Sequence, residues 1–435
     1  MKPPAASDIA YLAQKFSLFG RLTDASQQFL HALYLRYQFS FQQFRLLVEY
    51  GRDLEMWNEA SFEHHWRECE RRTADVNDVR VRKDKAFAEL RNRLQRIKAA
   101  PTNYTQQSIR TPRRMPLEYI DESSGRTIFG YCPVASEKTV CCNLRTLDAV
   151  QNCRYACSYC TIQTFYGNNV IFDKDLPHKL QQLESELESG RYYRIGTGQS
   201  SDALAWGNRN GMLDQLCAFA RRNRQILLEF KTKSGFFRWF EENDAPPNVV
   251  CSWTLNPDII IAAEEHATAQ LDQRITAARK VADTGTKIAF HFHPLVYYEE
   301  WEAAYPELAQ RIIDTFDPAE VLFVSFGSVT FIKPVIKAIR KRGEPTRILQ
   351  MDMVPGPHGK LTYPDEIKVR MFKKMYATFE PWHSNVFFYL CMERDYFWHQ
   401  TFGHCYPSNE AFERDFGKQV MAKINRSSQP ARSQR

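Results

Sequence analysis

Cys153-Arg-Tyr-Ala-Cys157-Ser-Tyr-Cys160 directly follows an apolar segment, Leu144–Val150, whose pattern predicts a β-strand. From this point the chain alternates short apolar runs with amphipathic stretches of helical period. The further predicted strands are Tyr192–Thr197, Ile226–Lys231, Val249–Leu255, Lys287–Phe292 and Val321–Phe326. The helices predicted between them are Leu176–Glu188, Leu213–Asn223, Leu271–Ala282 and Trp301–Phe316. Strand, helix and strand at this spacing predict parallel pairing with right-handed crossovers.

Six such units predict an α/β fold, either a partial (β/α)6 barrel of the TIM type or an open, doubly wound sheet. Periodicity does not separate these two architectures. In a barrel, the loops at the carboxyl ends of the strands build the active site. The three cysteines follow the first predicted strand on such a loop, which makes this loop the candidate site.

The sequence before the first strand predicts an N-terminal helical region over residues 1–100. Apolar residues recur at helical spacing from Ser7 to Met56, and a second amphipathic run ends before Pro101, which stops a helix. Residues 101–143 contain several prolines and are predicted to be a loop segment. The remaining predicted parts are the barrel at 144–345, an α/β extension at 346–424 with a helix at Asp365–Phe379 and a strand at Val386–Leu390, and a disordered tail at 425–435.

The composition is that of a globular protein, with 43% hydrophobic and 25% charged residues. No apolar run is long enough to cross a bilayer, and the segment from Met1 to Ala10 lacks the apolar core of a secretion signal. We therefore expect a cytoplasmic protein with no membrane partner. The formal charge of +7 permits a polyanionic partner without demonstrating one.

Eleven cysteines fit a reducing compartment, and their crowding around one loop indicates metal or redox chemistry. Three thiolates on one short loop can each bind one iron of a [4Fe-4S] cubane, which leaves the fourth iron without a protein ligand. Such an open iron can coordinate a substrate or cofactor, so Cys153, Cys157 and Cys160 are the candidate metal ligands. The alternatives are zinc with a fourth ligand from Cys141, Cys142 or a histidine, and core cysteines that bind no metal.

The C-x3-C-x2-C loop after the first strand resembles the signature of the radical S-adenosylmethionine superfamily. Within that superfamily, residues 144–340 resemble the spore photoproduct lyase family. The resemblance rests on Cys157-Ser-Tyr-Cys160-Thr-Ile-Gln163-Thr164, Arg194-Ile-Gly-Thr-Gly-Gln-Ser-Ser201-Asp202, Phe230-Lys-Thr-Lys233, Ala277-Ala-Arg-Lys-Val281, Gly285-Thr-Lys287, Trp301 and Lys333-Pro334. The first 140 residues show no such resemblance.

The resemblance implies a partial barrel in which S-adenosylmethionine chelates the open iron and is reduced to give a 5′-deoxyadenosyl radical. It also implies an electron donor such as flavodoxin or ferredoxin, and repair of a thymine–thymine adduct in DNA. For the cofactor it implies contacts from Lys233, Ser201, Asp202 and Ser252. From the residues alone, Lys233 is more typical of a solvated loop lysine, and Ser201 and Asp202 are equally an N-cap of the following helix.

Two positions depart from the family's pattern for returning a hydrogen atom to the substrate radical. The family has a cysteine where this chain has Gln199, and a tyrosine where it has Thr161. An amide has no weak bond to hydrogen that could replace a thiol. Tyr159 and the Gln199 position are both candidate catalytic sites. Cys141 and Cys142 are candidate replacement thiols or, alternatively, ordinary loop or core cysteines.

His291 and His293 lie at the end of the fifth predicted strand, before Pro294. Because side chains alternate along a strand, both rings are expected on the same side of the sheet, near the mouth of the barrel. A histidine there is suited to proton transfer, so His293 is a candidate catalytic residue. A structural histidine with satisfied hydrogen bonds is the alternative.

Basic groups recur along the chain and are of the kind that contacts phosphates. They lie at Arg71/Arg72, Arg80–Lys85, Arg113/Arg114, Arg221/Arg222/Arg224 and Lys337–Arg342. Each group alone is typical of a solvated helix face, but together with the resemblance they favour a damaged or modified pyrimidine in DNA as the substrate. Two other functions stay open. One is a radical enzyme acting on RNA, a peptide or a small molecule; the other is a DNA-binding protein with a structural or redox-sensing cluster.

Overall fold

The structure is a computed structural model that describes residues 9–105, 116–123, 125–132 and 138–427. The described residues fall into two compact units. Unit 1 contains the residues up to 105 together with 297–299 and 331–353, and unit 2 contains the others. The boundaries predicted at residues 100, 143, 345 and 424 follow the order of the chain. The grouping in space joins 331–353 to the N-terminal helices, which a reading along the sequence could not reveal.

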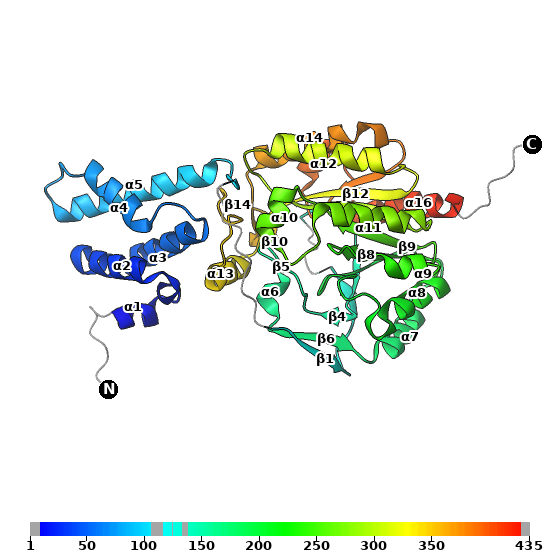
Figure 1. The fold of residues 1–435 in the computed structure, drawn as a ribbon. Helices are drawn as coiled ribbons and strands as arrows, with labels where there is room; N and C mark the ends of the chain where they lie inside the picture. The colour runs from blue at the N-terminus through cyan, green and yellow to red at the C-terminus, as the bar shows by residue number, and fades with distance from the viewer. Residues whose placement is uncertain (1–8, 106–115, 124, 133–137, 428–435) are drawn as a thin grey trace, which may run out of the picture. The chain divides into compact units, whose positions relative to one another are not determined.

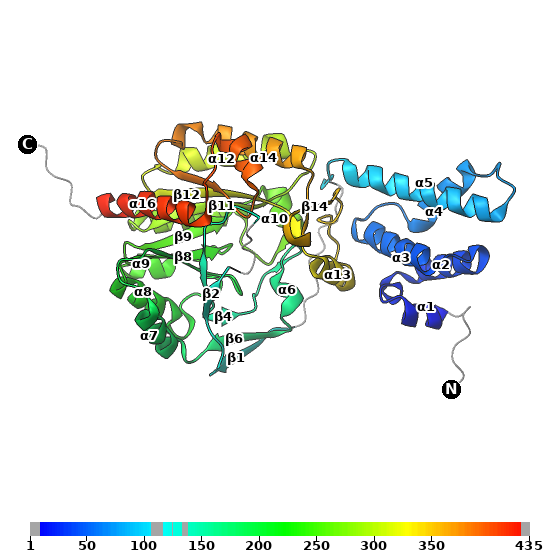
Figure 2. The same cartoon turned by 180° about the vertical axis from the view of Figure 1, so that it is seen from behind.

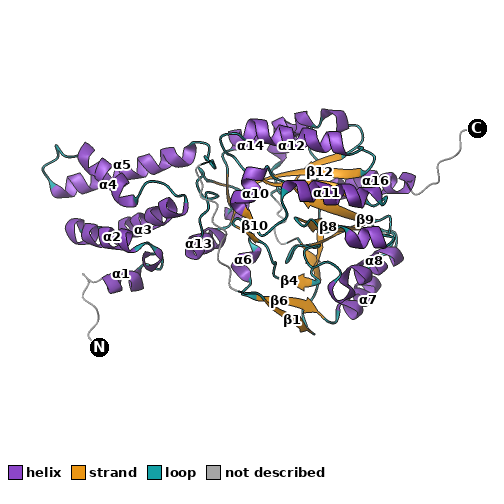
Figure 3. Cartoon of the chain, viewed as in Figure 1, coloured by secondary structure: helices purple, strands orange, loops and turns teal. Residues whose placement is uncertain are grey.

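Unit 2 is built on an eight-stranded sheet that curls into a partial barrel (Figures 1 and 3). All neighbouring strands are parallel except β2, which runs antiparallel to β3. The strand order is β16 (Phe387–Leu390), β12 (Val321–Ser328), β11 (Lys287–Leu295), β9 (Val249–Thr254), β8 (Ile226–Thr232), β7 (Tyr193–Thr197), β3 (Arg145–Leu147) and β2 (Phe129–Tyr131). The partial-barrel prediction is confirmed. Each of the six predicted strand segments overlaps one strand of this sheet, namely β3, β7, β8, β9, β11 or β12.

Helices alternate with these strands, as predicted, and pack on the outer face of the sheet. On β8, Phe230 points outward and contacts Phe240 of α9, with ring centroids 6.3 Å apart. Alternation therefore turns Glu229 and Lys231 toward the inner face. The helices of this layer are α7 (Leu176–Glu186), α8 (Met212–Arg222), α9 (Arg238–Glu242), α11 (Leu271–Asp283), α12 (Trp301–Thr315) and α14 (Asp365–Thr378).

The inner face is covered at one end by α16 (Asn409–Ser427), which is seen in Figure 2, the view of the protein from behind. Phe416 of this helix lies against Phe323 of β12 and Tyr389 of β16, with ring centroids 5.4 and 6.0 Å away. Lys423 donates hydrogen bonds to backbone carbonyls that precede β12 and β16. The helix therefore lies at the end of the sheet where the strands begin.

The segments around the first strand differ from the prediction. The predicted strand Leu144–Val150 is interrupted, because β3 joins the large sheet whereas β4 (Val150–Gln151) pairs with β6 (Asn169–Asp173). The chain turns at Asp148, whose carboxylate accepts a hydrogen bond from the backbone N–H of Ser200 at 3.1 Å. Residues 101–143, predicted as a loop segment, contain β2 and also β1 (Glu118–Glu122), which pairs with β6.

The C-terminal region adds to the barrel instead of forming a separate layer. Its strand β16 pairs with β12 and becomes an edge of the large sheet. Of the tail predicted to be disordered, residues 425–427 belong to α16 and residues 428–435 lie outside the described residues.

Unit 1 is helical, as predicted for the N-terminal region. Side-chain caps fix the helix starts, for example Ser40 with Gln43 at α3. Arg340 of α13 donates to both carboxylate oxygens of the buried Asp53 of α3, at 2.7 and 2.8 Å. The helices are α1 (Ile9–Lys15), α2 (Asp24–Tyr37), α3 (Phe41–Met56), α4 (Phe62–Arg72), α5 (Val79–Ala99) and α13 (Lys333–Arg342). None of the helices within the described ranges of the chain combines the length and apolar composition that a membrane crossing requires.

A buried histidine makes unit 1 sensitive to acid. His65 of α4 is 3% exposed, and neither ring nitrogen has a hydrogen-bond partner among the described residues. Burial, together with Arg93, lowers the pKa of His65 to about 4, below the value of about 6.5 in an unfolded chain. As the pH falls below about 6.5, the unfolded chain therefore binds a proton first, and stability is lost until the folded histidine titrates.

We expect His65 to cost unit 1 about 2 kcal/mol of unfolding free energy between pH 7 and pH 5. His65→Leu should remove this loss, because leucine binds no proton in either state. His64→Leu, at the exposed neighbouring position, should retain it. Amide hydrogen exchange of α4 at the two pH values measures the free energy of opening. The same pH dependence in His65→Leu and in the unaltered protein would contradict this account.

Candidate functional site

The cysteine loop begins at a fixed corner of the chain. Asn152 has a left-handed backbone with φ of 71°, and its side chain donates to the carbonyls of Gly167 and Asn169 at 2.8 and 3.0 Å. Its side-chain oxygen accepts a hydrogen bond from the backbone N–H of Cys153 at 2.8 Å. Cys153 and Cys157 are buried, Cys160 is partly exposed, and all three lie in one cluster with Tyr155, Tyr159, Ile162, Ala205 and Trp206. The structure thus brings the three predicted ligands together.

A two-stranded ladder holds the loop from the other side. β5 (Ala156–Cys157) pairs antiparallel with β10 (Glu265–His266), and Glu265 stands opposite Cys157. The backbone N–H of Ser158 donates to the carbonyl of Glu264 at 2.8 Å. The Tyr159 hydroxyl donates to the carboxylate of Glu265. Tyr159, a predicted catalytic residue, is therefore hydrogen-bonded to a buried carboxylate.

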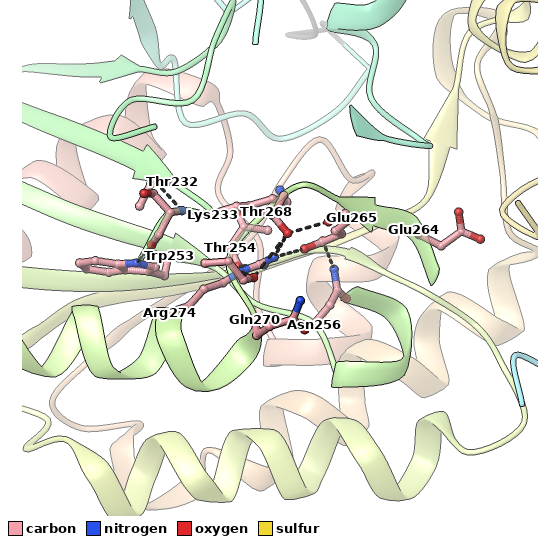
Figure 4. Close-up of polar contacts among 12 residues, drawn as sticks. Thr232, Lys233, Trp253, Thr254, Asn256, Glu264, Glu265, Thr268, Gln270 and Arg274 are labelled. Atoms are coloured by element: carbon pink, nitrogen blue, oxygen red, sulfur yellow. Dashed lines mark hydrogen bonds and ion pairs between the residues drawn. The ribbon is translucent and has the colours of Figure 1, made fainter. Parts of the chain in front are cut away.

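Glu265 is the centre of a buried polar cluster behind this ladder (Figure 4). Arg274 of α11 forms an ion pair with it at 2.6 Å, and both side chains are fully buried. Asn256 donates to the same carboxylate at 2.8 Å, and Arg274 also donates to the carbonyl of Thr254 at 2.8 Å. Burial opposes ionisation, but the charges of Arg274 and Lys233 outweigh it and hold the pKa of Glu265 below its ordinary value. This cluster was not predicted from the sequence.

Asp202 fixes the end of β8 against the loop that follows β7. Its carboxylate accepts hydrogen bonds from the backbone N–H of Lys233 at 2.6 Å, from the Thr232 hydroxyl at 2.7 Å and from two N–H groups of its own turn. It therefore caps this turn and is not the N-cap of α8. The Lys233 ammonium has no hydrogen bond or ion pair among the described residues, and its nitrogen lies 5.8 Å from the centre of the Tyr159 ring. A cation is thus held beside the cysteine loop.

The other predicted cofactor contacts are engaged within the protein. Ser201 accepts a hydrogen bond at 2.8 Å from the indole N–H of Trp206, which packs on the cysteine cluster. Ser252 is fully buried and donates to the carboxylate of Glu229 at 2.7 Å. Ser201 therefore lies beside the cysteine loop, whereas Ser252 faces the interior of the sheet.

Gln199, the position at which the family has a cysteine, lies half-buried directly after β7. Gly198 before it has φ of 97°, and a Cβ there would lie 3.0 Å from the carbonyl oxygen of Lys231 and 3.1 Å from that of Ser201. Only glycine fits this close backbone approach. The loop that carries Gln199 is therefore fixed against the end of β8.

Polar side chains joined by hydrogen bonds line the inner face of the sheet and form the inner polar chain: Arg194, Glu229, Ser252, His291, Ser325 and His293. Of these, only Ser252 and the two histidines were predicted from the sequence. Glu229 of β8 accepts hydrogen bonds from Arg194 of β7 at 2.8 Å and from His291 of β11 at 2.6 Å. His291 contacts the Ser325 hydroxyl at 2.5 Å, and Ser325 contacts His293 at 3.1 Å. Both histidines thus face the same side of the sheet. An arginine and a glutamate inside apolar strands were the sequence signal that could have revealed this chain.

Cys141 and Cys142 lie in a segment beside the end of β16. The backbone N–H of Val140 donates to the carbonyl of Glu393 at 3.0 Å. A hydrogen bond from the Cys141 thiol lowers the pKa of Cys142 to about 6, with help from Arg194 and against the effect of burial. The same bond raises the pKa of Cys141. The Cys142 sulfur is therefore near Arg194, on the inner side of the sheet.

The donor set of the cysteine loop fits an iron–sulfur cluster. Each thiolate of a cubane binds a different iron, so the ligands stand farther apart than around a single ion. Within the described parts of the chain, no group of three or more His, Cys, Asp or Glu side chains is arranged to hold one metal ion. The backbone N–H of Tyr155 donates to the Cys153 sulfur at 3.4 Å, a contact that stabilises a thiolate. Burial raises the pKa of Cys153 to about 12, so a metal must displace a proton to bind it.

A sequence model described as Spore photoproduct lyase matches residues 146–369, just over half of the chain. The chain belongs to the spore photoproduct lyase family. The match includes the cysteine loop and the inner polar chain from β7 to β12, and residues 1–145 lie outside it. The family resemblance drawn from the cysteine loop and the strand ends is therefore confirmed.

Curated relatives carry the same family name. The spore photoproduct lyase of Clostridium acetobutylicum is 24% identical over 183 residues, which are 41% of this chain and 54% of that protein. The Bacillus subtilis enzyme is 26% identical over 203 residues, 45% of this chain and 59% of that protein. The chain thus spans between half and two thirds of the length of the curated relatives it matches.

Solved structures of spore photoproduct lyase share the fold. One, complexed with dinucleoside spore photoproduct, has a TM-score of 0.54 at 21% identity and covers 62% of this chain and 82% of that chain. A second, a mutant with bound AdoMet and dinucleoside spore photoproduct, has a TM-score of 0.52 at 22% identity with the same coverage.

Glu265→Gln should loosen the cysteine loop. The substitution leaves Arg274 as a buried charge without its counter-ion, which should lower the free energy of unfolding by about 3–5 kcal/mol. It also weakens the hydrogen bond that Glu265 accepts from Tyr159. We expect alkylation of Cys153 and Cys157 in iron-free protein, followed by mass spectrometry, to be at least about tenfold faster.

Glu241→Gln is the matched control, because Glu241 forms an exposed ion pair with Lys280 at 3.6 Å and should leave the alkylation rates unchanged. Equal rates in Glu265→Gln and the unaltered protein would mean that the β5–β10 ladder alone holds the loop.

Proposed function

We propose that the protein is a radical S-adenosylmethionine enzyme that acts on a damaged or modified pyrimidine in DNA. Cys153, Cys157 and Cys160 hold the [4Fe-4S] cluster, and Lys233 pairs with the carboxylate of S-adenosylmethionine. One observation carries the proposal: three clustered thiols lie beside an ammonium that has no ion-pair partner among the described residues.

When bound, the cluster supplies the electron that converts S-adenosylmethionine into a 5′-deoxyadenosyl radical. The protein's own residues bind and orient the cofactor. Lys233 offers three N–H donors to a carboxylate. Ser201 accepts from Trp206, so its hydroxyl proton is available to a ligand. Asp202 acts by fixing the backbone of Lys233, and Ser252 acts through Glu229.

The hydrogen-return step in this proposal differs from that of the family. Gln199 supplies no thiol, and Thr161 supplies no phenol. The hydrogen bond from the Cys141 thiol lowers the pKa of Cys142 and raises that of Cys141, so Cys141 is the member of the pair that holds its S–H hydrogen more firmly. Cys141 keeps its proton and is the proposed donor, with Cys142 as its partner. Clean turnover of a spore photoproduct dinucleotide by a Cys141→Ala variant, without by-products of radical trapping, would exclude this assignment.

Support for DNA as substrate comes from the relative that is complexed with dinucleoside spore photoproduct. The basic groups of the sequence add little, because several are paired within the protein: Arg72 with Glu89, Arg222 with Glu184 and Arg340 with Asp53. Arg113 and Arg114 lie outside the described residues.

A cytoplasmic location and an electron donor such as flavodoxin or ferredoxin belong to the same proposal. None of the eleven cysteines, all of which lie in the described part of the chain, forms a disulfide, which suits a reducing compartment.

Anaerobic reconstitution with iron and sulfide tests the proposal. The unaltered protein should take up about four irons and release 5′-deoxyadenosine when given S-adenosylmethionine, a reductant and irradiated DNA. Cys157→Ala should lose the cluster and the release. Cys405→Ala is the control, because that cysteine is partly exposed and lies outside the cysteine loop, and it should retain both.

Each alternative function has its own outcome in this experiment. Bound zinc, or a cluster without 5′-deoxyadenosine, would overturn the radical mechanism and favour a DNA-binding protein with a structural or redox-sensing centre. Release of 5′-deoxyadenosine with substrate turnover on RNA, a peptide or a small molecule, but not on DNA, would favour a radical enzyme of another class.

A further inference from the structure

The inner polar chain has a fixed direction of hydrogen bonding that starts at Glu229. Arg194 donates to one carboxylate oxygen of Glu229 at 2.8 and 3.2 Å. The other oxygen receives the Ser252 hydroxyl at 2.7 Å and Nε2 of His291 at 2.6 Å. The carboxylate is ionised beside Arg194 and only accepts, so His291 carries its proton on Nε2.

His291 is neutral in this arrangement. Arg194 already balances the charge of Glu229, so an imidazolium at His291 would have no counter-ion of its own. Burial and the charge of Lys231 lower the pKa of His291 to about 3. With its proton on Nε2, Nδ1 of His291 can only accept, so the Ser325 hydroxyl donates to it at 2.5 Å.

The hydrogen bond from Ser325 to His291 also fixes which group donates in the contact between Ser325 and His293. The single hydroxyl proton of Ser325 is given to His291, so the serine oxygen accepts from Nε2–H of His293 at 3.1 Å. His293 is thereby held in the Nε2–H tautomer, and its Nδ1 is left as an acceptor. No hydrogen bond to this Nδ1 is found in the described part of the chain, and His293 is only partly buried.

The ring of His293 is held in place by its surroundings. It lies over Gly327 of β12, where an added Cβ would approach two ring atoms to 3.2 Å. The charged and titratable groups that act on it are Lys231 and Glu229 of β8, Lys233 directly after β8, and His291 of its own strand. Burial and the two lysines lower the pKa of His293 well below its ordinary value, so Nδ1 keeps its lone pair at neutral pH.

We propose that His293 binds an N–H donor of the substrate through Nδ1, and that His291 and Ser325 are positioning residues that fix its tautomer. The Lys231 side chain faces the same interior and acts on His293 by its charge, and its ammonium, which has no hydrogen bond or ion pair among the described residues, supplies N–H donors nearby. An acceptor beside donors is complementary to an imide, whose N–H is flanked by carbonyl oxygens. Thymine and uracil carry such an N–H, whereas cytosine presents an acceptor at that position. The inference rests on the proposed function and narrows its substrate class.

Nuclear magnetic resonance of protein labelled with 15N-histidine tests the tautomer. In long-range 1H–15N spectra at pH 7.5, the His293 signals, assigned by their loss in His293→Gln, should show neutral imidazole with the proton on Nε2. Ser325→Ala should shift them toward a mixture of tautomers. His383, whose Nε2 contacts the backbone carbonyl of Tyr376 at 2.9 Å, should remain unchanged as an internal control. A proton on Nδ1, or an imidazolium ring, would overturn the proposal.

Binding of a short single-stranded oligothymidylate tests the substrate class. The same oligonucleotide with N3-methylthymine lacks the imide proton and should bind the unaltered protein at least about fivefold more weakly, because the acceptor is left unpaired. His293→Phe should bind both equally, and His293→Gln, which keeps an acceptor oxygen, should recover part of the difference. An equal effect of methylation in the unaltered protein and in His293→Phe, or none in either, would overturn the assignment.

The proposed radical mechanism and the proposed role of His293 are contradicted by different results. The tautomer and the effect of N3-methylation are read in iron-free protein, without S-adenosylmethionine or reductant. Absence of 5′-deoxyadenosine would count against the radical mechanism while leaving these readouts intact. Loss of the methylation effect would count against the role of His293 while leaving 5′-deoxyadenosine release intact.

Discussion

The interior of unit 2 depends on how one carboxylate, Glu229, is satisfied at the centre of the curled sheet. A buried carboxylate without partners costs several kcal/mol, and here the cost is offset by donors from β7, β9 and β11. Those donors meet only when the strands stand in the observed register, since a shift by one residue would turn each of them to the outer face. The Glu229 carboxylate therefore depends on this strand register and also helps to specify it.

Arg194, the counter-ion of Glu229, extends this dependence to the C-terminal region. Its guanidinium donates to the Tyr389 hydroxyl of β16 at 2.8 Å and lies 4.5 Å from the ring of Phe323 and 4.4 Å from that of Phe416. Because arginine stacks on aromatic faces while its edge donates hydrogen bonds, one side chain joins β7, β12, β16 and α16. Glu265 has the same part at the cysteine loop, where a second buried ion pair holds a segment with little regular structure of its own.

The sequence predicted the elements of unit 2 well, because apolar runs and helical periods are local properties. It also predicted that the loop cysteines come together, since their spacing on one loop requires no other part of the chain. It did not reveal the role of Glu265 and its partner Arg274, because the hydrogen bond from Tyr159 to Glu265 joins residues far apart in the chain. The broken first strand escaped prediction for a similar reason, since the turn at Asp148 is fixed by a backbone N–H of residue 200.

Residues 331–353 give unit 1 an unusual relation to the order of synthesis. The chain leaves unit 1 after its first five helices, builds most of the barrel, and only then supplies α13, whose Arg340 neutralises Asp53. A ribosome must therefore make the elements from β1 to β13 after α5 before unit 1 can be completed. The N-terminal helices are accordingly a module that neither truncation nor transplantation of a single contiguous segment can reproduce.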